Sequence, residues 1–144
     1  MERRPAGFLP IAAFAVAGII FLTYNAQAQN PGGNPDARTM KNPVPPTKAS
    51  VTAGAASFKK YCAFCHGAGA KGDGPLTPKG MTKPADLTDE KWERGSTDGE
   101  IFTVIMEGAG PKFEMKGLKG KIADREVWQI VNFLRSLGPK AGTR

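Results

Sequence analysis

The feature that most constrains this chain is a pair of cysteines three positions apart, with a histidine directly after the second. Cys62, Cys65 and His66 include both cysteines and the single histidine of the 144-residue sequence. On one helical turn, residues i and i+3 share a face, so both thiols can reach the vinyl groups of one porphyrin edge. The imidazole then lies where it can bind the iron. This spacing is the attachment signature of a c-type haem, and we expect one covalently held haem c here.

Three other interpretations compete with haem attachment. A zinc knuckle needs four ligands, and this cluster offers three, with no further Cys or His in the chain. A thioredoxin-like dithiol is typical of a βαβ frame, which the sequence does not offer. A disulfide between Cys62 and Cys65 leaves His66 unexplained. The motif as a whole therefore favours haem.

Residues 1–28 have the pattern of a secretory signal peptide. Arg3 and Arg4 precede an apolar run, and an Ala-x-Ala cleavage signal ends at Ala28. The alternative is an uncleaved membrane anchor, because residues 6–24 approach the length that spans a bilayer. Both interpretations place the rest of the chain outside the cytoplasm, in a periplasmic setting, since the arginines hold the N-terminus inside.

A composition change follows at residue 29. Residues 29–50 contain five prolines and two glycines with almost no large apolar side chains, which predicts a semi-extended linker rather than a packed segment. The folded domain is expected over residues 51–144, with its core between Val51 and Leu137. That length is small for a self-sufficient core, so a porphyrin would supply part of the apolar bulk.

The domain is expected to be all-α, because no run shows convincing strand alternation. A first helix is predicted from about Thr52 to Cys62. A second, short helix is predicted to start at Asp86 or Thr88 and to include Trp92.

Two further helices have clearer boundaries. Thr97-Asp98-Gly99-Glu100 has the spacing of a capping box and opens a helix that Gly108 ends. The last helix is predicted from a cap at Asp124 to Leu137, because apolar residues recur there at helical spacing.

The sixth iron ligand must come from a residue other than histidine. A methionine thioether is the natural partner in a low-spin electron carrier. Met40 lies in the expected linker, and Met106 on a helix face, where methionine is more often core filler. Met115, in the loop before the last helix, is the favoured ligand, and Met81 is the alternative.

Several motifs, in order, resemble those of class I monohaem c-type cytochromes. They are Cys62-Ala63-Phe64-Cys65-His66, Gly72-Asp73-Gly74-Pro75, Lys83-Pro84-Ala85-Asp86-Leu87, Asp98-Gly99-Glu100-Ile101-Phe102 and the run from Val127 to Leu137. The resemblance covers about residues 53–137. It implies a small helical fold wrapped around the haem, as in free periplasmic cytochromes and in cytochrome subunits of respiratory complexes.

The resemblance also implies roles for particular residues. A prolyl carbonyl just after the motif accepts the hydrogen bond from the histidine Nδ1–H, and this role falls on Pro75. The first and last helices are expected to cross where Gly54 and Phe58 meet Ile130 and Phe133. The sequence departs from the family at Lys116, where a proline often follows the methionine ligand. It departs again at Phe133, which is often tyrosine.

These features imply an electron carrier and not an enzyme. The alternatives are a membrane-anchored subunit of a respiratory complex and a haem protein with an open sixth site. The net charge of +7 becomes +6 without residues 1–28, and seven lysines lie on the loops expected to frame the haem: Lys71, Lys79, Lys83, Lys112, Lys116, Lys119 and Lys121. They suggest redox partners with acidic docking surfaces, or else a merely solvated surface. Nucleic acid is not expected as a partner in this compartment.

Overall fold

A computed structural model describes residues 34–76, 82–110 and 115–138. The expected signal peptide or anchor, Met81, Lys79 and Lys112 lie outside these residues. The elements in chain order are α1 (Lys48–Tyr61), α2 (Ala63–His66), α3 (Asp98–Glu107), β1 (Gly108–Ala109), β2 (Met115–Lys116) and α4 (Asp124–Leu137). The predicted helical fold is therefore confirmed, with one short antiparallel ladder added between β1 and β2.

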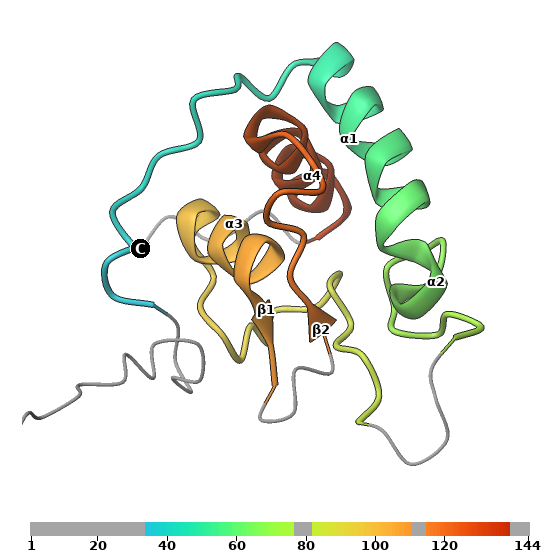
Figure 1. Cartoon of the computed structure of the whole chain (residues 1–144). Coiled ribbons are helices and arrows are strands. Elements are labelled where there is room, and N and C mark those ends of the chain that lie inside the picture. The colour runs from blue at the N-terminus through green and yellow to red at the C-terminus, as the bar shows by residue number, and fades with distance from the viewer. Residues whose placement is uncertain (1–33, 77–81, 111–114, 139–144) are drawn as a thin grey trace, which may run out of the picture.

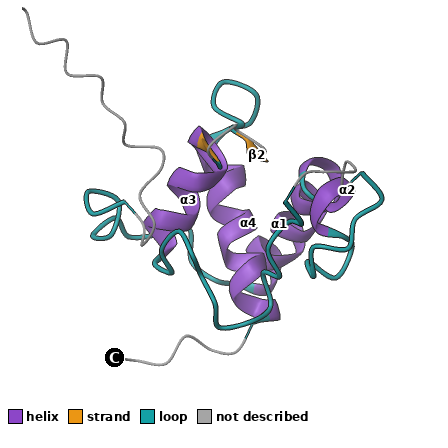
Figure 2. Cartoon of the chain, turned by 90° about the horizontal axis from the view of Figure 1, so that it is seen from below, coloured by secondary structure: helices purple, strands orange, loops and turns teal. Residues whose placement is uncertain are grey.

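Helix α4 lies between α1 and α3 in both views (Figures 1 and 2). Its crossing with α1 is very close, because a Cβ placed on Gly54 would lie 1.9 Å from the backbone oxygen of Gln129. The rings of Phe58 and Phe133 pack beside this point, with centroids 5.2 Å apart. Ile130 is fully buried in the same core. The expected crossing of the first and last helices is thus present.

Helix α3 begins where its sequence predicts. The Thr97 hydroxyl accepts a hydrogen bond from the Glu100 backbone N–H, and the Glu100 carboxylate accepts one from the Thr97 N–H. This pair satisfies two of the backbone donors that a helix start leaves without partners. The start of α4 lies one residue earlier than expected, since Ala123 is the N-cap and Asp124 the first helical residue.

The helix expected from Asp86 or Thr88 through Trp92 is not formed. The Asp86 carboxylate instead accepts hydrogen bonds from the backbone and hydroxyl of Thr88. The Asp89 carboxylate accepts one from the Lys91 backbone. Such local bonds take up the backbone donors that a helix would use, and they favour successive turns.

The segment before α1 also differs from its expected form. Residues 34–47, here called the strap, run past α3 on the way to the start of α1 (Figure 1). Ala37 and Val44 in the strap are buried, at 2% and 6% exposure, and Val44 belongs to the main core. Helix α1 starts at Lys48, ahead of the predicted Thr52. Ala37 and Val44 are the apolar anchors of the strap, and its prolines present no backbone N–H that needs a partner.

A buried amide fixes the strap to α4. Asn132, 5% exposed, donates to the carbonyl oxygens of Val44 and Pro45 and accepts from the side chain of Asn42 at 2.9 Å. Glu100 is 2% exposed and pairs with Arg38 of the strap at 3.2 Å. The strap therefore supplies hydrogen-bond partners to two buried polar residues of the helices.

Candidate functional site

The two cysteines and the histidine lie on one continuous helical turn. Cys62 links α1 to α2, and its backbone oxygen accepts from the N–H groups of Cys65, at 3.1 Å, and His66, at 2.9 Å. Both cysteines are free thiols, Cys62 half-buried against the core and Cys65 exposed. A helical turn of this kind is what the prediction of both thiols on one face requires.

Burial governs the chemistry of the inner thiol. Burial, and secondarily the neighbouring Cys65, raises the pKa of Cys62 to about 12. Redox-active cysteines instead need a thiolate near neutral pH, which a basic neighbour or a helix N-terminus provides. The environment of Cys62 therefore does not favour a thioredoxin-like dithiol.

The imidazole of His66 is oriented by a backbone carbonyl. Its Nδ1 lies 3.3 Å from the oxygen of Ala85. A carbonyl can only accept, so Nδ1 is the protonated nitrogen and Nε2 of the neutral ring keeps its lone pair. Burial lowers the pKa of His66, and the Ala85 carbonyl opposes this in part. The neutral ring with a free Nε2 is the form that binds a metal.

The residue that accepts the hydrogen bond from Nδ1 of His66 is not Pro75, which the resemblance to c-type cytochromes implied. Residues 74–76 run back along α2, where the N–H groups of Gly74 and Leu76 donate to the oxygens of Cys65 and Phe64. The Ala85 carbonyl, and not that of Pro75, is the one that the structure has at Nδ1. Ala85 belongs to the motif over residues 83–87, which is the sequence signal for this acceptor.

Two contacts hold the segment around Ala85 close to residues 67–72, which follow His66 and are here called the histidine loop. The N–H of Leu87 donates to the oxygen of Ala70 at 2.8 Å. A Cβ on Gly72 would lie 2.0 Å from the oxygen of Pro84, so only glycine permits this approach. Gly72 thus allows the segment that orients His66 to pass close to the chain that follows the histidine.

The methionine candidates fall in different environments. Met115 lies in β2 and is half-buried against the core. Met106 is also half-buried, on α3, while Met40 is 40% exposed in the strap. The alternative ligand Met81 lies outside the described residues.

The residues present fit a haem in two respects. The donor set of two thiols and one neutral imidazole on a single turn is the set that attaches and ligates haem c. Large apolar side chains also remain partly exposed next to the motif, at Tyr61, and on the segment that orients His66, at Leu87. We therefore name Cys62, Cys65 and His66 as the residues that would hold the group.

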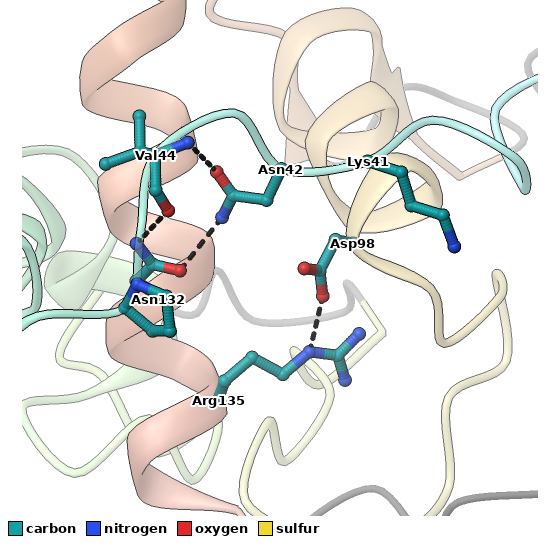
Figure 3. Close-up of a pocket in the computed structure, with 7 residues that line it drawn as sticks. Lys41, Asn42, Val44, Asp98, Asn132 and Arg135 are labelled. Carbon is teal, nitrogen blue, oxygen red and sulfur yellow. Dashed lines mark hydrogen bonds and ion pairs between the residues drawn. The ribbon is translucent and has the colours of Figure 1, made fainter.

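A pocket of about 430 Å³ lies elsewhere, between the strap and the N-terminal part of α3 (Figure 3). Among its lining residues, the side chain of Asn42 donates to Asn132 at 2.9 Å, and Arg135 donates to Asp98 at 2.8 Å (Figure 3). The first pair joins the strap to α4, and the second joins α4 to α3.

Comparison with known proteins identifies the domain. Residues 49–134 match the family model described as Cytochrome C oxidase, cbb3-type, subunit III. The cbb3-type cytochrome c oxidase subunit CcoP of Rhodobacter capsulatus is 28% identical over 99 residues, which are 65% of this chain and 31% of that protein. The chain thus spans less than a third of the length of this curated relative.

Solved structures agree with the fold. Cytochrome cL of Methylophaga aminisulfidivorans has a TM-score of 0.52 at 22% identity and covers 63% of this chain and 57% of its own. Cytochrome cL of Hyphomicrobium denitrificans has a TM-score of 0.52 at 18% identity, covering 74% and 64%. A chain of the Kuenenia stuttgartiensis reducing HAO-like protein complex has a TM-score of 0.61 at 24% identity, covering 69% and 50%. At such identities the likeness establishes the fold alone.

No helix within residues 34–76, 82–110 and 115–138 is long and apolar enough to cross a membrane. The motif at residues 62–66, the helical fold and the match over 49–134 lead to one assignment. The chain belongs to the family of cbb3-type cytochrome c oxidase subunit III, and its folded part is a cytochrome c domain.

Proposed function

We propose that this chain carries single electrons on one haem c, held by Cys62 and Cys65, with its iron between His66 and Met115. The observation that carries the proposal is the turn at residues 62–66, whose histidine presents a free Nε2 because Ala85 occupies Nδ1. When bound, the haem supplies an iron that alternates between the ferrous and ferric states.

Each ligand residue has its own task. The hydrogen bond to the Ala85 carbonyl fixes the His66 ring and strengthens its donation to iron. The Met115 thioether favours ferrous iron and raises the reduction potential. By filling the sixth position, Met115 also leaves no site for a substrate, so we propose a carrier and not an enzyme.

Spectroscopy of the haem-loaded full chain tests this assignment. We expect a ferric Met–iron charge-transfer band and a one-electron reduction. Met115→Ala should abolish the band, lower the potential and open the iron to carbon monoxide, while Met106→Leu and Met81→Leu leave the spectrum unchanged. Because Lys116 could bind iron at high pH, the test is run near neutral pH with a Met115→Ala, Lys116→Ala control.

Two outcomes would reassign the site. A band that survives Met115→Ala and vanishes in Met81→Leu would make Met81 the ligand. A wild-type protein without the band would be a haem protein with an open site.

The surface charge supports a protein partner with an acidic docking surface. Lys71, Lys83, Lys116, Lys119 and Lys121 are all exposed, although Lys119 is paired with Glu107 at 2.8 Å. Such a surface raises encounter rates with an acidic partner, and added salt screens the effect. We expect the electron-transfer rate with an acidic redox protein to fall as ionic strength rises. A rate independent of salt would indicate a solvated surface without a docking role.

Two exposed apolar side chains offer such a partner a contact beside the outer thiol. Phe64 and Leu76 are 57% and 59% exposed, and the backbone N–H of Leu76 donates to the oxygen of Phe64 at 2.9 Å. Both lie next to Cys65 in sequence or by backbone contact. We propose that this pair forms an apolar contact with the partner beside Cys65.

A membrane-anchored subunit of a respiratory complex is the second candidate. The matched relative is a cbb3-type oxidase subunit, and residues 6–24 form an apolar run. The intact mass of the mature protein separates the two candidates. Loss of residues 1–28 supports a periplasmic carrier, and their retention supports the anchored subunit.

A further inference from the structure

The segment that carries Met115 is attached to the end of α3 by its backbone. In the ladder, Met115 pairs with Ala109 and Lys116 with Gly108. Beyond the ladder, the N–H of Leu118 donates to the oxygen of Ile105 at 3.0 Å. The last carbonyl groups of a helix have no partner within the helix, so these bonds also complete the end of α3.

A further bond continues the attachment, as the N–H of Lys119 donates to the oxygen of Met106 at 3.1 Å. The approach is close enough to require glycine at Gly117. A Cβ there would lie 2.4 Å from the oxygen of Met106 and 2.6 Å from the carbonyl carbon of Glu107. Gly117 does not have a positive φ, so its requirement is one of space and not of backbone conformation.

The attachment to α3 matters because Lys116, and not a proline, follows Met115. Proline would restrict the backbone on the C-terminal side of the methionine, but this chain has Lys116 there. The restriction is provided instead by contacts with α3, whose Ile105 is buried at 4% exposure. The end of α3 is therefore a firm support for the segment.

We propose that residues 115–119 and the last turn of α3 form a clasp that positions the Met115 sulfur, with Gly117 as its positioning residue. This inference rests on the proposed role of Met115 as iron ligand. The clasp holds the backbone of Met115 in place before the thioether binds, so the ligand needs little reordering of its own.

The first test uses Gly117→Ala in the haem-loaded full chain. The added methyl group should push the segment away from α3 and weaken the Met–iron bond. We expect a weaker ferric charge-transfer band, a lower potential and about tenfold tighter binding of imidazole to ferric iron, which is ~1.4 kcal/mol. Gly138→Ala is the matched control, because its Cβ would meet no atom closer than 3.8 Å. It should leave all three readouts unchanged.

The second test separates cause from effect and does not depend on the folding of Gly117→Ala. If the clasp positions the methionine, the amides of Leu118 and Lys119 should exchange with solvent within twofold of the wild-type rates in Met115→Ala. If the iron bond holds the segment, their exchange should accelerate strongly, and the inference is overturned. The second test therefore decides the matter even if Gly117→Ala does not fold.

The tests also separate this inference from the proposed function. If Met115→Ala leaves the charge-transfer band intact, Met115 is not the ligand and both proposals fail together. If Met115→Ala abolishes the band while Gly117→Ala changes imidazole binding less than twofold, the ligand stands and the clasp is rejected.

Discussion

Two regions of the domain are completed in different ways. One is the side of α4 that faces the strap, and the other is the helical turn at residues 62–66 that carries the haem motif. On the strap side, Asn132 is nearly enclosed, and its amide bonds Asn42, Val44 and Ser50. On α2, Phe64 and Cys65 are exposed and His66 presents a free nitrogen. The polypeptide thus completes the first region by itself, whereas the second is shaped for a group that the polypeptide does not supply.

This difference indicates which interactions should stabilise each of the two regions. The α1–α4 crossing depends on close packing between backbone and rings, so changes there should lower the stability while the haem stays attached with an unchanged spectrum. The region around residues 62–66 leaves apolar side chains half-covered, and bound haem would remove that surface from water. Changes at the two regions should therefore have different signatures.

The largest expected effect comes from removing both thiols. The wild-type chain should keep its haem through acid–acetone extraction, because thioether bonds are covalent. Cys62→Ala with Cys65→Ala should yield a chain without haem and without a cooperative thermal transition, since much of its apolar surface stays uncovered. Phe64→Ala lies between the cysteines and should keep the haem. A double variant that melts like the wild type would show that the region around residues 62–66 does not need the haem for its stability.

Gly54→Val should have the next largest effect, and it acts on the crossing alone. Its side chain would collide with the Gln129 backbone, which cannot rotate away, so we expect a loss of ~1–3 kcal/mol or more. Phe133→Ala at the same crossing should cost ~3 kcal/mol, near the lower end for large-to-small changes because the ring is half-buried. Thermal melts of the haem-loaded protein provide the measurement.

The control for the crossing is Ala56→Val, at an exposed position of the same helix. It changes helix propensity without a collision and should cost less than ~1 kcal/mol. Near-wild-type melting of Gly54→Val and Phe133→Ala would contradict the crossed-helix packing.

Asn132→Ala tests the strap side and should cost ~1–3 kcal/mol, because it removes the donors to the Val44 and Pro45 carbonyls in a buried setting. The haem spectrum should not change. Ser136→Ala, exposed on the same helix, is the control and should melt like the wild type. A shifted Met–iron band in Asn132→Ala would show that the two regions are coupled.

Much of this architecture could be predicted from the sequence, because its signals are local. The spacing of Cys62, Cys65 and His66, the capping box at α3 and the apolar stripe of α4 each act within a turn or two of helix. The strap could not be predicted in this way, since its contacts join residues far apart in the chain, as Asn42 and Asn132 do. Its prolines and few apolar residues have the composition of a linker.

The site was predictable to a similar extent. The haem motif follows from residue types alone, whereas the partner of the His66 ring depends on how the chain returns. Pro75 is nearer in sequence, but Gly72 lets the segment with Ala85 approach the histidine loop. The missing helix near Trp92 has a similar origin, because Asp86 and Asp89 bind the backbone locally. Sequence patterns did not decide between a cap and a turn at these positions.

The smallest expected effect is on the pH dependence of the stability, through the Glu100 carboxylate that pairs with Arg38 of the strap. Burial of the Glu100 carboxylate acts to raise its pKa, but bonds from Thr97 and Arg38 outweigh this, so the pKa of Glu100 lies below its ordinary value of 4.5. A carboxyl with a lowered folded pKa stabilises the fold fully above its unfolded value, and that contribution is lost as pH falls through the folded pKa. Glu100→Gln should therefore flatten the loss of stability below about pH 4.5, measured by denaturant melts from pH 7 to pH 3. Glu93→Gln removes an equal charge from an exposed position and should leave that slope as it is in the wild type. An unchanged slope in Glu100→Gln would mean that neither the bonds from Thr97 nor the pair with Arg38 contributes to stability, and that packing by Ala37 and Val44 and the bonds of Asn132 hold the strap.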